Sequence, residues 1–257
     1  MYRVTIGTDR DGNRIEIIGR NCRTDTLSAK GKAIVRIAGE NPGLFGAFVD
    51  IVMNCKSIAV CRSVIDETMR PYVDQGGYRG AKKLTKELRE YFATSYGMSL
   101  EDRRSYLVEE TMVFVALERA QCKSEQNPSV CREAYAVAGC SRMCPEHNDK
   151  NIDVICVWPR RGLGIECKAR LSNWLSLRRG DCGSYQMKPE VVQKLRFMVD
   201  LAEALREKNI VFTLKLGTLE SENSLTGHMG ALDGMGFKNM GLIGKESLKD
   251  VLLNVKG

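Results

Sequence analysis

Histidine is scarce in this chain, and its scarcity narrows the chemistry that the protein can carry out. Only two histidines occur among 257 residues, His147 and His228. A zinc hydrolase built on several imidazoles, or a nuclease that holds its metal through histidines, needs more of them. The sequence also contains no G-x-x-x-x-G-K-[ST] motif, so it lacks the phosphate-binding loop of P-loop ATPases and helicases.

Long apolar runs are missing as well. The best candidate, residues 44–53, is too short to cross a bilayer and is interrupted by Asp50. The N-terminal segment M-Y-R-V-T-I-G-T-D lacks the apolar core of a secretion signal. We therefore expect a cytoplasmic protein that has no membrane partner.

The chain carries an excess of positive charge. Its net charge is +7, with 43% hydrophobic and 28% charged residues, a globular composition. The length allows one large domain, or one domain with an accessory lobe. The excess charge favours a polyanionic partner, because lysines and arginines that contact phosphates release counterions. Ordinary solubility charge is the alternative.

Ten cysteines are present, and without a secretion signal we expect mostly reduced thiols. A structural metal is one explanation of their number, and disulfides in a thermophilic host are another. Buried thiols that pack as small apolar side chains are the third. The candidate ligands of a structural Zn²⁺ are Cys131, Cys140, Cys144 and His147.

The most informative stretch covers residues 151–170, where two apolar runs flank the turn P-R-R-G and predict a β-hairpin. Asp153, Glu166 and Lys168 interrupt these runs, although an unpaired buried carboxylate is costly to desolvate. Glu166 and Lys168 are two residues apart, so they point to the same side of their strand. We expect them to converge with Asp153 at one edge of a sheet. The alternative is an edge hairpin in which Glu166 and Lys168 form a surface ion pair.

The patterns around this hairpin follow a definite order. A helix is expected over residues 99–122, a strand over 134–139, a loop over 170–188, a helix over 188–206 and a strand over 210–216. The order is therefore helix, strand, strand, strand, helix, strand. Outside it we expect a hairpin over 2–18, mostly helices over 27–88, a strand over 240–243 and a terminal helix over 246–255. The glycine- and methionine-rich segment 227–244 shows no motif.

Two carboxylates beside a lysine suit the hydrolysis of a phosphodiester, which needs an activated water and neutralisation of charge at phosphorus. Mg²⁺, or Mn²⁺, can do both and prefers oxygen ligands. Asp153 and Glu166 would supply carboxylates, and the backbone carbonyl of Cys167 would be the third protein ligand. Lys168 would orient or help to deprotonate the attacking water, or stabilise the transition state.

The pattern D-x12-E-C-K, with a helix and a strand on each side, resembles the PD-(D/E)xK nuclease superfamily. The resemblance covers residues 99–218. It departs from the motif's name at one position, because this chain has Ile152 where the name has proline. It implies an α/β, restriction-endonuclease-like core, with a mixed central sheet flanked by helices. It also implies Mg²⁺-dependent cleavage by Asp153, Glu166 and Lys168.

Members of this superfamily often add side chains from the two helices. An acidic residue of the first helix frequently lies near the metal, and Glu110 is our candidate, ahead of Glu118. Some members carry a glutamine on the second helix, which corresponds here to Gln193. The alternative for each of these residues is a solvated position on a helix surface.

We interpret the chain as a DNA endonuclease, and within that class we favour a type II restriction enzyme that cuts double-stranded DNA as a homodimer. Residues 1–98 would form a mostly helical accessory lobe that recognises DNA, and residues 99–257 the nuclease domain with a C-terminal extension. A structure-selective nuclease of repair or of a defence system is the alternative, and a non-catalytic nucleic-acid-binding module is the third. DNA contacts are expected from Lys82, Lys83, Arg160, Arg161, Arg178 and Arg179.

Overall fold

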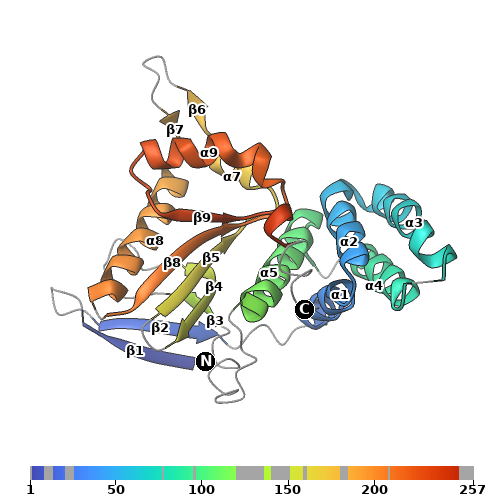
Figure 1. The fold of residues 1–257 in the computed structure, drawn as a ribbon, viewed down its shortest axis with the longest axis horizontal. Coiled ribbons are helices and arrows are strands. Elements are labelled where there is room, and N and C mark those ends of the chain that lie inside the picture. Colours follow the sequence, from blue (N-terminus) through green and yellow to red (C-terminus); the bar gives the residue numbers. More distant parts are fainter. Residues whose placement is uncertain are drawn as a thin grey trace.

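A computed structural model describes residues 2–8, 14–20, 26–76, 78–94, 97–119, 136–139, 151–158, 161–179, 185–207 and 209–248. It is a mixed α/β structure in which a layer of N-terminal helices lies beside a twisted sheet (Figure 1). The N-terminal helices are α1 (Thr26–Gly39), α2 (Pro42–Asn54), α3 (Ile58–Asp74) and α4 (Ala81–Ala93). Asn41 caps α2 by accepting a hydrogen bond from the Gly43 N–H, and Ser57 caps α3 in the same way.

The sheet has seven strands, which lie in their order along the chain. Neighbouring strands are antiparallel from the first to the fifth, and the last two run parallel to the fifth. The strands are β1 (Tyr2–Thr8), β2 (Arg14–Arg20), β3 (Ala136–Gly139), β4 (Asn151–Trp158), β5 (Arg161–Cys167), β8 (Val211–Gly217) and β9 (Met240–Ile243). The mixed character of the sheet agrees with the expectation from the sequence.

The N-terminal hairpin β1–β2 belongs to this sheet rather than to the helical lobe. Strand β2 pairs antiparallel with β3, with Ile18 opposite Gly139. The boundary that we expected at residue 98 therefore does not separate the sheet from the helices. The expected hairpin itself is present, but its partner strand lies more than 100 residues further along the chain, which no local pattern indicates.

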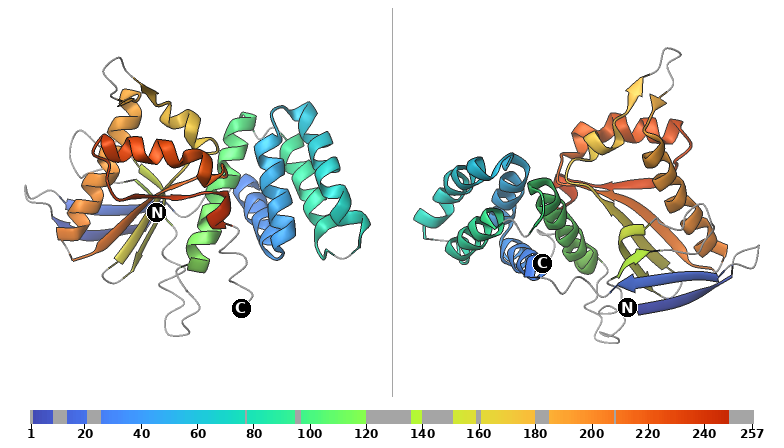
Figure 2. Two further views of the ribbon diagram at one scale, coloured as in Figure 1. Left: turned by 45° about the horizontal axis from the view of Figure 1, so that its top comes forward. Right: turned by 180° about the vertical axis from the view of Figure 1, so that it is seen from behind.

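Helices cover both faces of the sheet (Figure 2). Helix α5 (Leu100–Arg119) contacts β4, β5 and β8 on the face toward the N-terminal helices. The opposite face carries α7 (Leu171–Leu175), α8 (Pro189–Glu207) and α9 (Glu222–Gly234). The sequence did not predict α7 or α9, and the segment after α7 also contains a short ribbon, β6 (Arg178–Arg179) with β7 (Tyr185–Gln186). At the C-terminal end the structure describes one helical turn over residues 245–248 of the expected terminal helix.

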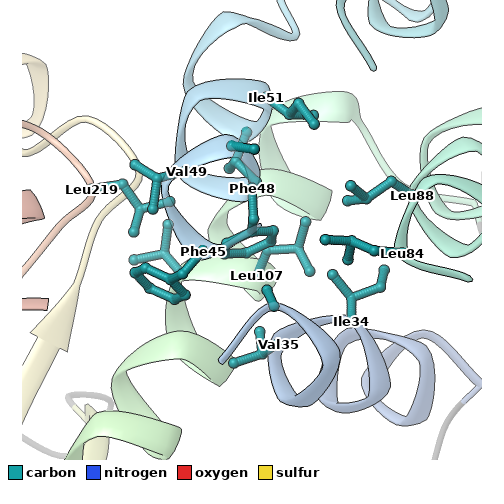
Figure 3. Close-up of a cluster of buried hydrophobic side chains, with 14 of the residues drawn as sticks. Ile34, Val35, Phe45, Phe48, Val49, Ile51, Leu84, Leu88, Leu107 and Leu219 are labelled. Atoms are coloured by element: carbon teal, nitrogen blue, oxygen red, sulfur yellow. The ribbon is translucent and has the colours of Figure 1, made fainter. Parts of the chain in front are cut away.

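One apolar cluster connects the N-terminal helices to the sheet. Phe45 and Phe48 of α2 and Leu107 of α5 are fully buried in it (Figure 3). The same cluster includes Ile165 and Cys167 of β5, so the face of β5 toward α5 is packed against the lobe. We conclude that the lobe and the sheet share a core rather than meeting across a separable interface.

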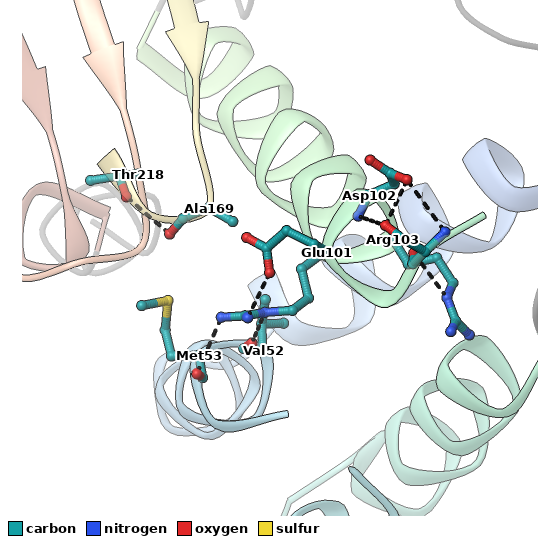
Figure 4. A network of polar contacts seen from close by, with 9 residues as sticks. Val52, Met53, Glu101, Asp102, Arg103, Ala169 and Thr218 are labelled. Carbon is teal, nitrogen blue, oxygen red and sulfur yellow. Dashed lines mark hydrogen bonds and ion pairs between the residues drawn. The ribbon is translucent and has the colours of Figure 1, made fainter. Parts of the chain in front are cut away.

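Two buried arginines fasten the start of α5 to the ends of N-terminal helices (Figure 4). Arg103 donates hydrogen bonds to the carbonyls of Phe92 at 2.8 Å and Thr94 at 2.5 Å, at the end of α4. Arg104 donates to the carbonyl of Val52 at 2.8 Å, near the end of α2. The last carbonyls of a helix lack intrahelical partners and carry partial negative charge. A guanidinium at this end donates hydrogen bonds to these carbonyls and also balances their charge.

Gly217, at the end of β8, allows α5 to lie close to the sheet. A Cβ atom at this position would lie 2.9 Å from both Ile165 Cγ2 and Met112 Cγ. We expect Gly217→Ala to lower the free energy of unfolding by about 1–3 kcal/mol, because a crowded core must shift to accept the methyl group. Chemical denaturation measures the change.

The matched control is Gly230→Ala in α9, where an added Cβ meets nothing within 4 Å. Alanine favours a helix interior by roughly 0.5–1 kcal/mol over glycine, so this variant should be slightly more stable than the wild type. Equal stability of the two variants would contradict the close approach at Gly217.

Candidate active site

The C-terminal end of β5 places Glu166 and Lys168 side by side. Lys168 Nζ lies 2.5 Å from Glu166 Oε1, and the Glu166 side chain is only 3% exposed. Strand β5 is not an edge strand, because it lies between β4 and β8. The pair is therefore not the surface ion pair of an edge hairpin, which was the alternative interpretation of the sequence.

Asp153 joins this pair where the β4–β5 ladder ends. The last paired residues on this side are Val154 and Ile165. The Cys167 N–H points toward β4 and donates to Asp153 Oδ2 at 2.7 Å, so a carboxylate takes the place of a ladder carbonyl. On the other side, the Lys168 N–H donates to the Gly217 carbonyl of β8 at 2.9 Å. Backbone hydrogen bonds thus fix the position of the site from both sides.

The Lys168 ammonium contacts all three oxygens that the sequence assigned to a metal. It lies 2.5 Å from Glu166 Oε1, 3.0 Å from the Cys167 carbonyl and 3.4 Å from Asp153 Oδ2. Three oxygens that converge on one cation form an arrangement suited to Mg²⁺, which prefers carboxylate and carbonyl ligands. Trp174 of α7 borders the same ammonium, with its ring centroid 5.2 Å from Nζ.

Lys194 of α8 is a member of the site that the sequence interpretation missed. Its Nζ lies 3.0 Å from Glu166 Oε2 and its side chain is 13% exposed. The contact is an ion pair without hydrogen-bond geometry, since the buried Oε2 accepts no hydrogen bond in the described structure. Gln193, the residue of this helix that the sequence suggested, is exposed.

A sequence signal for Lys194 existed. It follows Val191 by three residues and precedes Met198 by four, so it lies on the stripe that α8 buries. A lysine on such a stripe needs a partner inside the protein, because an unpaired buried ammonium is costly. Glu166 is that partner.

Burial and neighbouring charges shift the ionisation of the two central groups. Burial raises the pKa of the Glu166 carboxyl, and the Asp153 carboxylate adds to this effect while Lys168 and Lys194 oppose it. Burial by itself lowers the pKa of Lys168, but attraction to Glu166 and Asp153 outweighs it and leaves this pKa above its ordinary value. The arrangement therefore favours the ammonium form of Lys168, a source of positive charge and hydrogen bonds.

Of two neighbouring acidic residues of α5, Glu109 acts electrostatically on the end of β5, whereas Glu110 faces another helix. Burial, Asp153 and then Glu109 raise the pKa of the Cys167 thiol, so Glu109 acts on the end of β5. Glu110 is directed toward α1, where a Cβ on Gly31 would lie 3.3 Å from its Cγ. The spacing along the helix did not distinguish these neighbours, because both flank the buried positions Val108 and Met112.

The other candidate residues are distributed away from this cluster. Lys82 and Lys83 are exposed on α4, and Arg178 is exposed on β6. For Arg161 and Arg179 the structure describes the backbone, at the start of β5 and in β6. Arg160, Glu118's side chain and the four candidate zinc ligands Cys131, Cys140, Cys144 and His147 lie outside the described residues. The cysteines whose side chains are described, Cys55, Cys61 and Cys167, are buried free thiols.

Comparison with protein-family models, with curated proteins and with solved structures finds no match to this chain. Within the described residues, no three His, Cys, Asp or Glu side chains gather as a metal-binding group. The candidate set at β5 has two such side chains, and its third oxygen is a backbone carbonyl. No helix in the described part of the chain is long and apolar enough to span a bilayer.

Proposed function

We propose that the protein is a Mg²⁺-dependent nuclease that hydrolyses phosphodiester bonds in DNA. The observation that carries the proposal is the convergence of Asp153, Glu166 and Lys168 at the end of β5. These residues come from two strands and bring two carboxylates, one carbonyl and one ammonium to a single point. Chance placement of a surface ion pair would not bury Glu166 or direct the Cys167 N–H onto Asp153.

The residues present fit a divalent cation. Glu166 Oε2 is buried and accepts no hydrogen bond, and the three other oxygens already converge on one positive charge. Asp153, Glu166 and the Cys167 carbonyl would hold Mg²⁺ or Mn²⁺. When bound, such a metal neutralises charge on the scissile phosphate and lowers the pKa of a bound water.

The protein's own cations have separate tasks in this proposal. Lys168 is 27% exposed, so it can reach a substrate phosphate and stabilise the charge that develops there. Lys194 remains against Glu166 and holds that carboxylate in place from the α8 side. The Glu109 charge, which raises the pKa of the Cys167 thiol, would add negative potential favourable to a cation.

The order of elements supports a restriction-endonuclease-like core. Helix α5 precedes β3, β4 and β5, and α8 and β8 follow. Strands β3, β4, β5 and β8 are neighbours, the first three antiparallel and the last parallel to β5. This is the helix–strand–strand–strand–helix–strand order on which the resemblance to the PD-(D/E)xK superfamily rests.

Within this chemistry we propose a type II restriction endonuclease that acts on double-stranded DNA as a homodimer. The exposed Lys82 and Lys83 of α4 offer phosphate contacts, and the exposed Arg178 of β6 offers a DNA contact on a separate part of the surface. A nuclease selective for junctions or flaps would use the same catalytic residues, so substrate form separates the two functions.

Incubation with DNA in Mg²⁺ tests the proposal. Plasmid, linear phage DNA and a branched duplex are the substrates, and Asp153→Asn and Lys168→Ala are the control variants. Discrete fragments from linear DNA support a restriction enzyme, and cutting of the branched duplex alone supports a structure-selective nuclease. Equal activity of wild type and both variants would remove Asp153 and Lys168 from the mechanism.

Removal of the Lys168 ammonium should strengthen metal binding while it slows cleavage. The ammonium contacts the three candidate ligand oxygens and therefore competes with any cation for them. We expect Lys168→Met to bind Ca²⁺ at least about tenfold more tightly than the wild type, measured by titration calorimetry. Asp153→Asn should bind it more weakly. An unchanged affinity of Lys168→Met would show that the ammonium does not compete.

Loss of Lys194 should lower the rate of DNA cleavage, mostly at low pH. Lys194 lowers the pKa of Glu166, so Lys194→Met raises it, and the carboxylate form of Glu166 is then lost at a higher pH than in the wild type. We expect the acidic limb of the pH–rate profile to move to higher pH, and about a tenfold lower rate below that limb, the equivalent of about one pKa unit. Lys238→Met, an exposed lysine after α9, is the matched control. Superimposable profiles for Lys194→Met and the wild type would contradict the coupling.

A further inference from the structure

A two-stranded ribbon projects from the body of the protein between α7 and α8, the two helices that contact the candidate active site. Strand β6 pairs antiparallel with β7, and this pair is separate from the seven-stranded sheet. In Figures 1 and 2 the ribbon extends beyond α7 and α9 at the edge of the molecule. A small ribbon that is separate from the main sheet contributes little to the core. We therefore expect its role to lie in binding rather than in stability.

The described side chains of the ribbon are exposed and suited to DNA. Arg178 and Gln186 are exposed and lie directly opposite each other, so they share one face. Tyr185 is 43% exposed and is one of only a few large apolar side chains with that exposure among the described residues. The guanidinium and the amide offer hydrogen bonds that can recognise base edges, and the tyrosine ring adds an apolar surface.

Both ends of the ribbon are attached to elements that touch the catalytic residues. Two residues separate the ribbon from the end of α7, the helix that carries Trp174 against the Lys168 ammonium. Two residues also separate it from the start of α8, the helix that carries Lys194 against Glu166. The ribbon therefore has a defined position relative to the bond that the site would cut.

The start of this connection is itself held by the core. Glu220 accepts hydrogen bonds from both the backbone N–H and the hydroxyl of Ser172, at 2.9 and 2.5 Å, and fixes the first turn of α7. Ser176 ends α7 in the left-handed conformation at φ 43°, two residues before β6. The chain therefore enters the ribbon directly from α7.

We infer that the β6–β7 ribbon enters the major groove of duplex DNA bound across the active site and reads bases there. This inference rests on the proposed nuclease function and names the element that would determine its specificity. The major groove is about 12 Å wide and admits a two-stranded ribbon, and its base edges present the donors and acceptors that arginine and glutamine recognise. Arg178 and Gln186 contact base edges, and Tyr185 lies against the sugar or a thymine methyl group.

The test maps the ends that the enzyme produces on a long DNA of mixed sequence in Mg²⁺. Wild type, Arg178→Ala and Gln186→Ala are compared, with Arg206→Ala and Gln75→Ala as matched controls from exposed positions outside the ribbon and the site. We expect the wild type to prefer particular bases near the cut. In each ribbon variant the base preference at one position near the cut should fall about tenfold. Total cleavage should change less, and the controls should match the wild type.

Three outcomes would overturn the inference. In the first, the wild type produces ends without base preference, and in the second the ribbon variants keep the wild-type preference. The third outcome is a changed oligomeric state of the ribbon variants in sedimentation as their main defect, which would assign the ribbon to a contact between two copies. If the wild type makes no ends at all, the nuclease proposal fails separately. Binding of a labelled duplex in Ca²⁺ then decides the inference, because ribbon variants that bind as tightly as the wild type exclude contact with DNA.

Discussion

Asp153→Asn should reduce DNA cleavage by at least about 1,000-fold, the largest effect that we expect from one substitution. The substitution removes the negative charge that would hold the metal. In the wild type the Cys167 N–H donates to Asp153 Oδ2 at 2.7 Å, and the amide oxygen of asparagine can still accept this hydrogen bond. Chemistry should therefore be lost while the local backbone remains in place. The measurement is the initial rate of plasmid cleavage at several Mg²⁺ concentrations.

The control for this prediction is Asp233→Asn, an exposed aspartate of α9, which should cleave at the wild-type rate. Thermal unfolding of Asp153→Asn should follow the wild-type curve to within a few degrees, since the hydrogen bond is preserved. DNA cleavage within tenfold of the wild-type rate would remove Asp153 from the catalytic set. A variant that is inactive because it is unfolded would be recognised from its unfolding curve.

The hairpin that carries Asp153 and Glu166 could be predicted because it obeys local rules. Its apolar runs and the alternation of side chains place Glu166 and Lys168 on one side of β5 without reference to any distant residue. Strand β5 nevertheless begins earlier than expected, because Arg161 and Gly162 of the expected P-R-R-G turn pair with β4. The flanking helices and strands follow from periodicity in the same way, and β9 lies where it was expected, at Met240–Ile243. Whether this core cleaves DNA stays a prediction.

The parts that the sequence did not reveal depend on tertiary contacts. Helix α9 contains Gly227, Gly230 and Gly234, which disfavour a helix, yet burial of Leu225 and Leu232 against the sheet stabilises it. Pairing of β2 with β3, and the choice between Glu109 and Glu110, likewise depend on how distant segments pack.

Arg103→Met should be the most destabilising of the substitutions that we predict, with a loss of about 3 kcal/mol in the free energy of unfolding. Arg103 is 1% exposed and donates hydrogen bonds to the Phe92 and Thr94 carbonyls at the end of α4. Methionine fills part of the volume but leaves these carbonyls without their donor. For a chain of this size the loss corresponds to a fall of about 6–12 °C in the melting temperature, measured by calorimetry.

The matched control is Arg89→Met, because Arg89 also binds a partner on a neighbouring helix but does so at the surface. Its guanidinium lies 2.6 Å from Asp66 Oδ1, and the two side chains are 49% and 33% exposed. Solvent screens such a pair, so its loss should cost less than about 1 kcal/mol. Equal costs for the two variants would mean that the α4–α5 junction does not depend on Arg103. A large cost for Arg103→Met alone would show that a buried guanidinium joins the helical lobe to α5, the helix that packs against the catalytic strand.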